Sequence, residues 1–265
     1  FCHGRGVRLH VTVNTLLKDQ ELPRALEFVA FLCSLPVDAV LVQDMGLFSL
    51  LRQWAPALPV HASTQMSLHT LSGVKESARL GMTRAVLARE LSRGEISEIC
   101  ANSPIEIEAF VHGALCMCYS GQCEMSAVIG RRSGNRGACA QPCRYQYALM
   151  EEKRPGEYFP VFEDEKGTYI MNSRDMCMID HLDDIMDAGI DCIKIEGRAK
   201  SAYYAAIVTG AYRHVLDDVA AGREVDPVWR DEVEHVSHRH YSTGFYYGQP
   251  GQYYDCLLYT SPSPR

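Results

Sequence analysis

Residues 39–65, AVLVQDMGLFSLLRQWAPALPVHASTQ, contain the pattern that decides the fold. The run Ala39–Val42 is wholly apolar, which predicts a strand buried on both faces of a sheet. Apolar residues at helical spacing follow over 48–54, and a second short strand is predicted over Val60–Ala62. Strands that alternate with helices in this way indicate parallel β/α units.

The same alternation continues along most of the chain. Further strands are expected over 7–13, 85–87, 105–111 and 191–195, and further helices over 26–35, 71–80, 96–101 and 201–220. The alternation stops at a stretch rich in Cys, Gly and Arg that begins at Cys116, and it resumes after about residue 180. We therefore expect an α/β fold, a TIM-like (β/α) barrel with a cysteine-rich insertion at 116–180.

Polar side chains with useful chemistry stand where the predicted strands end. They are Asn14, Gln43, Thr64, Gln65, Arg89, Glu90, His112, Glu196 and Arg198. In a (β/α) barrel these ends form the active-site face, although ordinary loop polarity would also place polar residues there. Arg89 and Arg198 could each hold a carboxylate, or could pair with the neighbouring Glu90 and Glu196. Glu196 and His112 are candidates for proton transfer.

Composition limits the class of protein. The chain of 265 residues holds eleven cysteines and carries a net charge of −7. It has no run of about 18 apolar residues, so no membrane helix is predicted. Eleven cysteines in a long chain with strand–helix patterning indicate a reducing compartment, and we expect a cytoplasmic protein with metal-bound or free thiols.

Charge gives a more local hint about partners. The net negative charge argues against a protein that coats nucleic acid. Residues 130–144, however, contain four arginines and no acid, and these are Arg131, Arg132, Arg136 and Arg144. Such a patch could bind phosphates or carboxylates, or could be a solvated loop.

The cysteines carry the strongest chemical signal. Six of them lie in the glycine-lined insertion, at positions Cys116, Cys118, Cys123, Cys139, Cys143 and Cys177. Closely spaced thiolates on permissive backbone suit a metal or an iron–sulfur cluster. The absence of a C-x-x-C pair removes the main signature of zinc ribbons, while a structural zinc, or a catalytic Cys116 or Cys123 with His112, stays open. Cys33, Cys100 and Cys192 are interpreted as small core residues.

Residues 108–126 resemble the signature of peptidase family U32, the collagenase-like peptidase family. Ten signature positions match, and they are Glu108, Phe110, Gly113, Ala114, Leu115, Cys116, Gly121, Cys123, Met125 and Ser126. The resemblance extends to VTVN, STQ, LARELS, GNRGACAQPCR, NSRDMC, IKIEGR and SHRHYSTGF. It covers nearly all of residues 1–255. The chain contains neither H-E-x-x-H nor G-x-S-x-G, so the peptidase name has little support in the residues.

The resemblance implies an RNA-modifying enzyme. Similar proteins hydroxylate a tRNA wobble uridine with prephenate as the apparent donor, a ribosomal RNA cytidine, or a ubiquinone precursor. The resemblance also implies a [4Fe-4S] cluster on Cys116, Cys123, Cys139 and Cys177, with Cys143 as the rival for the third place and Cys118 as a bystander. A tRNA anticodon loop offers the single-stranded base that such an enzyme needs.

The resemblance also implies how the chain is divided. Residues 1–220 would form a barrel that lacks its first two strands, and 221–255 would begin a linker to a missing C-terminal domain. Residues 256–265, CLLYTSPSPR, read as a translated sequencing adapter rather than native sequence. The alternatives are a metal- or cysteine-dependent peptidase acting on collagen-like chains, and a non-catalytic RNA-binding protein with a structural metal.

Overall fold

Two units make up the chain. The computed structural model describes residues 1–116, 118–144, 148–150, 158–160 and 174–248. Unit 1 contains residues 1–110, 118–140 and 184–194, and unit 2 contains residues 111–117, 141–183 and 195–265.

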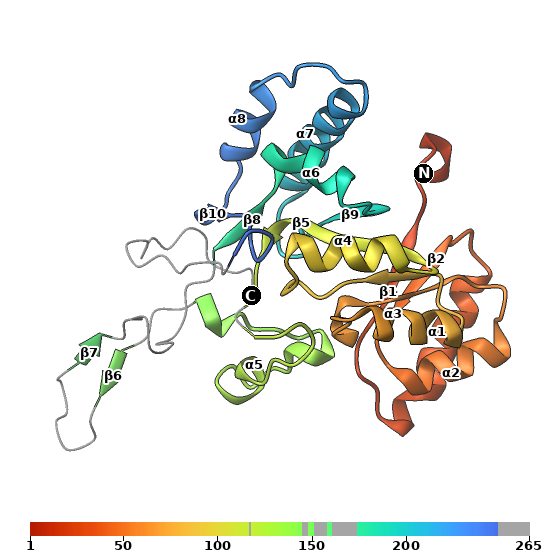
Figure 1. Cartoon of the computed structure of the whole chain (residues 1–265). Helices are drawn as coiled ribbons and strands as arrows, with labels where there is room; N and C mark the ends of the chain where they lie inside the picture. Colours follow the sequence, from red (N-terminus) through yellow and green to blue (C-terminus); the bar gives the residue numbers. More distant parts are fainter. Residues whose placement is uncertain (117, 145–147, 151–157, 161–173, 249–265) are drawn as a thin grey trace. The chain divides into compact units, whose positions relative to one another are not determined.

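Unit 1 is built on parallel strands that pair in chain order. They are β1 (His10–Val13), β2 (Ala39–Val42), β3 (Val60–Ala62), β4 (Arg84–Val86) and β5 (Glu106–Ala114). The helices that connect them are α1 (Leu22–Cys33), α2 (Met45–Trp54), α3 (Leu71–Leu80) and α4 (Arg93–Asn102), as Figure 1 shows. The short helix α5 (Met125–Val128) follows in the insertion, and β9 (Cys192–Ile195) also pairs with β5.

Local sequence sets where these helices begin. The Asp44 carboxylate accepts a hydrogen bond from the Leu47 amide at 2.9 Å and caps α2. Ser92 and Glu95 form a capping box at the start of α4. Helix α3 ends at Gly81, whose φ of 99° is a left-handed conformation that glycine adopts without strain. The caps of α2 and α4 fix the points at which the chain turns from a strand end into a helix.

The core of unit 1 lies around its central strands. Every residue of β2, β3 and β4 is buried, and Val40, Val42 and Val60 have no exposed surface. Leu47 and Leu51 of α2 are equally buried. Continuous burial of short apolar strands is the property that the run Ala39–Val42 predicts.

Unit 2 contains the end of β5 and a different arrangement of strands. Residues His112, Gly113 and Ala114 pair antiparallel with β8 (Asp175–Cys177), and β8 pairs parallel with β10 (Tyr241–Ser242). Helix α7 (Ala202–Ala220) contacts α8 (Val228–Glu234). The remaining elements are α6 (Leu182–Asp187), which begins in unit 2 and ends in unit 1, and the antiparallel pair β6 (Ala148–Met150) and β7 (Tyr158–Pro160).

The predicted α/β fold is confirmed as a mixed fold with a mostly parallel sheet, whereas the TIM-like barrel stays a prediction. The predicted ranges of β2, β3 and α3 match the structure. The antiparallel strand β8 was not predicted. The segment predicted to begin a linker, 221–255, contains α8 and β10. The predicted adapter translation, 256–265, lies outside the described residues, and the two strands expected to precede β1 stay a prediction. No helix among the described residues is long and apolar enough to cross a membrane.

Candidate functional site

The side chains that follow the strands of unit 1 gather at one end of the sheet, which we call the carboxyl rim. It comprises Asn14, Gln43, Thr64, Gln65, Arg89 and Glu90. Asn14 donates to the Ser63 hydroxyl at 3.1 Å, and the Thr64 hydroxyl donates to the Leu87 carbonyl at 3.0 Å. These hydrogen bonds tie neighbouring strand ends together, so the rim is a rigid frame.

Two amide oxygens on the carboxyl rim lack partners. The Gln43 side chain is 7% exposed, and its Nε2 lies 3.5 Å from the Gln65 carbonyl oxygen. Within the described part of the chain, the buried Oε1 atoms of Gln43 and Gln65 accept no hydrogen bond. A buried polar atom without a partner costs free energy, and in a native protein it needs an explanation.

The cysteine-bearing loop 118–124 is anchored on this rim. The Glu90 carboxylate accepts a hydrogen bond from the Ser120 amide at 2.9 Å, and the Ser67 hydroxyl donates to the Ser120 carbonyl. Gly121 has φ 78°, and a Cβ at this position would lie 2.1 Å from the Gln65 carbonyl oxygen. Only glycine allows the loop to approach the rim so closely.

Arg89 makes a contact that was not predicted, since the sequence suggested either carboxylate binding or an ion pair with Glu90. Its guanidinium carbon lies 3.6 Å from the centre of the Phe110 ring, which is a cation–π contact. Its neighbour Glu90 contacts Ser120 and lies 3.4 Å from His69. Phe110 belongs to the family-like signature, so this contact gives that aromatic position a physical role.

His112, a candidate for proton transfer, lies in unit 2 inside an enclosure of tyrosines. The centre of its ring is 5.3 Å from that of Tyr212, 5.4 Å from that of Tyr241 and 5.9 Å from that of Tyr204. Burial lowers the pKa of His112 to about 4, so its imidazole is neutral at pH 7.

The hydrogen bonds of Tyr212 assign the tautomer of His112. The Tyr212 hydroxyl donates to the Val111 carbonyl at 3.0 Å and accepts from the Met178 amide at 3.0 Å. It lies 3.2 Å from His112 Nδ1, which must then carry the proton and donate it to the remaining lone pair. His112 Nε2 is therefore an unprotonated acceptor, and no described residue donates to it.

Glu196 and Arg198 lie at the end of β9, next to His112. The Glu196 amide donates to the His112 carbonyl at 2.9 Å, and the Glu196 carboxylate accepts from the Arg198 amide at 2.9 Å. A Cβ on Gly113 would lie 2.4 Å from the Glu196 carbonyl oxygen, which explains a glycine at this signature position. The structure thus brings together His112, Glu196 and the backbone of Arg198.

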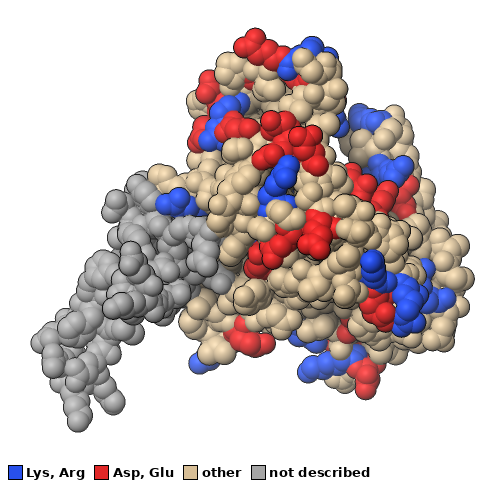
Figure 2. Space-filling view, in the orientation of Figure 1, with Lys and Arg blue, Asp and Glu red and all other residues tan. Residues whose placement is uncertain are grey.

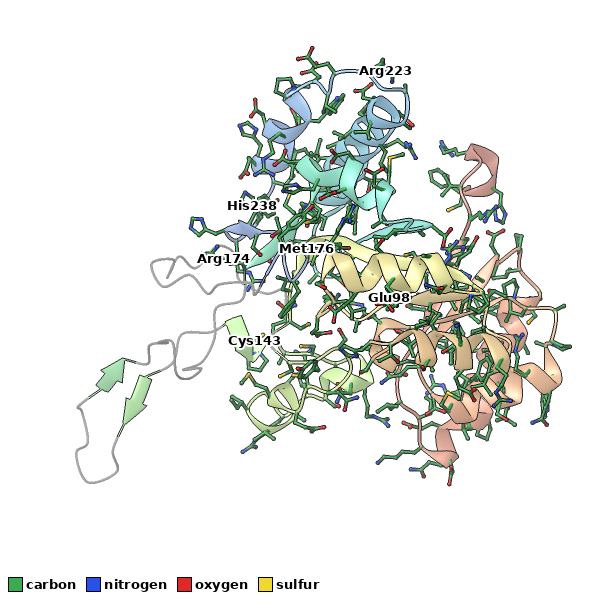
Figure 3. The ribbon with its side chains drawn as sticks, viewed as in Figure 1. Glu98, Cys143, Arg174, Met176, Arg223 and His238 are labelled. Carbon is green, nitrogen blue, oxygen red and sulfur yellow. The ribbon has the colours of Figure 1, made fainter. Side chains whose placement is uncertain are left out.

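Asp175 was missed from the sequence. It is the first residue of β8 and only 2% exposed, and Arg239 donates to its carboxylate at 2.6 Å while Lys200 lies 3.8 Å away. Burial opposes its ionisation, but the two cations overcome this effect and hold its pKa below the usual value. Figure 3 labels its neighbour Met176 in β8 and His238, which stacks on Tyr241 with ring centres 3.9 Å apart. A three-residue strand has too little pattern to be recognised in the sequence.

The four expected cluster ligands come from both units. Cys123 and Cys139 belong to unit 1, whereas Cys116 and Cys177 belong to unit 2. Cys116 and Cys139 are exposed, but Cys177 is buried and accepts a hydrogen bond from Arg230 at 3.3 Å, while the Tyr212 hydroxyl oxygen lies 3.8 Å from its sulfur. Burial raises the pKa of the Cys177 thiol.

The donor chemistry of these cysteines fits a cluster, since each supplies a thiol and the Arg230 guanidinium would stabilise an anionic sulfur. Among the described residues, however, no group of three or more His, Cys, Asp or Glu side chains forms a metal site. The ligand set therefore stays a prediction, as does the choice between Cys139 and Cys143. Of the cysteines interpreted as core residues, Cys33 is exposed, which corrects that interpretation. It ends α1 one residue after the buried Leu32 and so points to a different side of the helix.

The opposite end of the unit 1 strands holds an open cavity of about 930 Å³. His10, His61, Arg84 and Glu106 are among its lining residues. This cavity is therefore not at the predicted site, because these residues stand at or near the amino ends of β1, β3, β4 and β5.

A charge network lies beside the cavity. Buried Glu108 accepts hydrogen bonds from Lys194 and from Arg84, the latter at 3.1 Å, and Arg84 also bonds Glu106 at 2.8 Å. We call this set the amino-end cluster; it comprises His10, His61, Arg84, Glu106, Glu108 and Lys194. Burial opposes the ionisation of Glu108, but Lys194 and Arg84 together hold its pKa below the usual value.

Comparison with known proteins places the chain among relatives of similar sequence. Residues 1–255 match the profile of Peptidase family U32. The chain is 36% identical over 283 residues to tRNA hydroxylation protein P of Escherichia coli, covering 92% of this chain and 62% of that protein. It is 39% identical over 223 residues to the 23S rRNA 5-hydroxycytidine C2501 synthase of the same organism, covering 84% and 33%. An uncharacterised protease of Methanocaldococcus jannaschii is 36% identical over 254 residues, covering 93% and 61%. The chain thus spans about three-fifths of the first of these relatives.

Proposed function

The chain belongs to peptidase family U32, and from that membership we propose that it hydroxylates a pyrimidine in RNA, with a tRNA wobble uridine as the substrate. The observation that carries the proposal is the pair of relatives named for RNA hydroxylation, at 36% and 39% identity. One is named for tRNA and the other for a ribosomal cytidine, so the shared property is hydroxylation of RNA.

The proton-handling group of this proposal is His112. Its neutral ring, with Nδ1 held by Tyr212, leaves Nε2 to accept a proton or a hydrogen bond. Glu196 lies on the adjacent strand end, where its carboxylate is held by the Arg198 amide. Arg89 and Arg198 are each candidates to hold a carboxylate of a small donor such as prephenate.

Four thiolates would hold the expected cofactor. We assign Cys116, Cys123, Cys139 and Cys177 as the ligands of a [4Fe-4S] cluster, with Cys143 as the alternative to Cys139. Such a cluster supplies electron transfer or Lewis acidity when it is bound.

Phosphate contacts would come from the arginine-rich segment. Arg131 and Arg132 are exposed, whereas Arg136 bonds Glu21 of unit 1. The side chain of Arg144 lies outside the described residues. On the face shown in Figure 2, basic and acidic side chains are intermingled, so charge alone would give weak attraction for RNA. Recognition of an unpaired base in an anticodon loop would supply the remaining affinity for RNA.

Nucleoside analysis tests the proposed function. Deletion of the gene should remove a hydroxylated uridine from bulk tRNA, as measured by mass spectrometry of digested nucleosides, and the wild-type gene should restore it. Variants His112→Gln and Cys139→Ser should fail to restore it, whereas Cys33→Ser should restore it. Unchanged tRNA nucleosides together with the loss of a hydroxylated ribosomal cytidine would move the substrate to ribosomal RNA.

Iron and sulfide content tests the cofactor. Protein purified without oxygen should be brown and should contain iron and acid-labile sulfide, and Cys123→Ser should abolish both. Comparison of Cys139→Ser with Cys143→Ser identifies the third ligand. A colourless protein with stoichiometric zinc would contradict the cluster.

A further inference from the structure

An exposed aromatic ring stands beside the carboxyl rim of unit 1. Tyr119 is 65% exposed, in a loop where its neighbour Ser120 is only 3% exposed. Its ring meets that of His69 edge-on, with centres 5.7 Å apart. A large aromatic surface left open next to a predicted cofactor loop is available for a flat ligand.

The support beneath Tyr119 is rigid. His69 Nδ1 donates to the Ser67 carbonyl at 2.7 Å, and His69 Nε2 lies 3.4 Å from Glu90. Ser120 is held by Glu90, and Gln122 donates to the Ser67 hydroxyl at 3.3 Å. These bonds hold the backbone next to Tyr119 and the His69 ring that it contacts, which reduces the entropic cost of ordering the loop when a ligand binds.

The unpartnered amide oxygens of Gln43 and Gln65 adjoin this loop. Gly121, two residues from Tyr119, packs against the Gln65 backbone, and Gln65 in turn contacts Gln43. Rotation about the last side-chain bond, which is broad in glutamine, turns either oxygen toward a ligand on the rim. A ligand that satisfies these amide oxygens must carry an N–H donor on its edge.

A flat ring with an N–H donor on its edge describes a nucleobase. We propose that the carboxyl rim of unit 1 is a pyrimidine-binding site, in which Tyr119 stacks on the base and the amide oxygen of Gln43 or of Gln65 accepts its edge N–H. This inference rests on the proposed function, because RNA is the source of the base. It deepens that function by naming the residues that hold the base.

Binding of short RNAs to the full 265-residue chain tests the site. The probes are a labelled single-stranded heptanucleotide with a central uridine and the same RNA with 3-methyluridine, which lacks the N3–H donor. Fluorescence anisotropy measures the affinity. The wild-type chain should bind the uridine probe about 5- to 150-fold more tightly, since the methylated base leaves a buried acceptor unpaired.

Variants separate stacking from edge recognition. Tyr119→Ala should weaken binding of both probes by about 5- to 150-fold, whereas Tyr119→Phe keeps the ring and should stay within about threefold of the wild type. At least one of the variants Gln43→Leu and Gln65→Leu should abolish the preference for uridine over 3-methyluridine. Tyr203→Ala removes an exposed tyrosine of α7 and should change neither affinity nor preference.

The outcomes distinguish this site from the proposed function. Equal affinity of Tyr119→Ala and wild type, or an unchanged preference in both glutamine variants, overturns the site even if tRNA is hydroxylated normally. Binding that follows the expected pattern in a protein that hydroxylates no RNA overturns the proposed function and leaves the site standing.

Discussion

The two ends of the unit 1 strands are built on opposite principles. At the amino end, the charges of Arg84, Glu106, Glu108 and Lys194 compensate one another. At the carboxyl rim, amide oxygens of Gln43 and Gln65 stay without partners among the described residues. Compensated charge holds strands together, whereas unpartnered acceptors cost stability unless a ligand satisfies them.

His61 is the exception within the amino-end cluster. It is buried, and its Nδ1 has no hydrogen-bond partner among the described residues. Burial, with Arg84 as the second cause, lowers its pKa to about 4, so the ring is neutral and its unpaired nitrogen costs less than an unpaired charge. The comparison therefore predicts that substitution of the charged residues at the amino end changes stability, and that substitution of Gln43 or Gln65 at the rim changes ligand binding.

The largest effect is expected at Glu108. Glu108→Gln leaves the Arg84 and Lys194 charges without their shared carboxylate, and we expect a loss of about 3–5 kcal/mol in the free energy of unfolding, measured by urea denaturation. Glu106→Gln is the matched control, since the Glu106 side chain is 52% exposed, and it should cost less than about 1 kcal/mol. Similar losses for both variants would mean that burial of the charge does not matter.

Gly121→Ala should cause the next largest loss in the free energy of unfolding, because it disturbs the contact between loop 118–124 and the carboxyl rim. The left-handed backbone and the 2.1 Å approach to the Gln65 carbonyl together predict a cost of about 2–4 kcal/mol. Hydrogen exchange should rise across 118–124. Gly222→Ala shares a positive φ but has open space around it, so it should cost only about 1–2 kcal/mol. Unchanged exchange in the Gly121 variant would show that the loop is not anchored on the rim.

Lowering the pH should reduce the free energy of unfolding, because His61 at the amino end is buried in its neutral form. The pKa of His61 is about 4 in the folded chain and 6.5 as the reference value, so the unfolded chain takes up the proton first. Stability therefore falls as pH drops from about 6.5 towards 4, and His61 alone accounts for about 2.5 kcal/mol between pH 7 and 4.5. Over this pH range the free energy of unfolding of His61→Gln should fall by about 2.5 kcal/mol less than that of the wild type. An identical pH dependence in both proteins would rule out a buried, neutral His61.

The smallest effect is expected at Arg136. Its ion pair with Glu21 is exposed, so Arg136→Ala should leave the urea midpoint unchanged. The same arginine also donates to the Leu16 carbonyl and so ties the insertion to the loop after β1. Faster proteolysis near residue 136 with unchanged global stability would confirm this local role, and a shifted midpoint would contradict it.

Sequence patterns predicted the parts of the fold that local periodicity determines. The apolar run of β2 and the helical spacing of α3 gave their positions directly. Strand β8 was not predictable, because its three residues form a strand by pairing with the end of β5, more than 60 residues earlier, and with β10, more than 60 residues later. The polar strand ends were foreseen, including Gln43 and Gln65. Their lack of partners, and the support of Tyr119, depend on the packing of loop 118–124 against distant residues such as Ser67, which lies 55 positions before Gln122.

The partners of Glu108 also affect how the chain is made. Arg84 precedes this carboxylate by 24 residues, but Lys194 follows it by 86. At about 5–20 residues per second, the ribosome needs about 4–17 s to add the second cation after Glu108 has emerged from the peptidyl transferase centre. During synthesis, unit 1 therefore passes through a stage in which its interior carboxylate has only one counter-charge. Completion of its interior is therefore a late event in synthesis, because the second cation arrives only with residue 194.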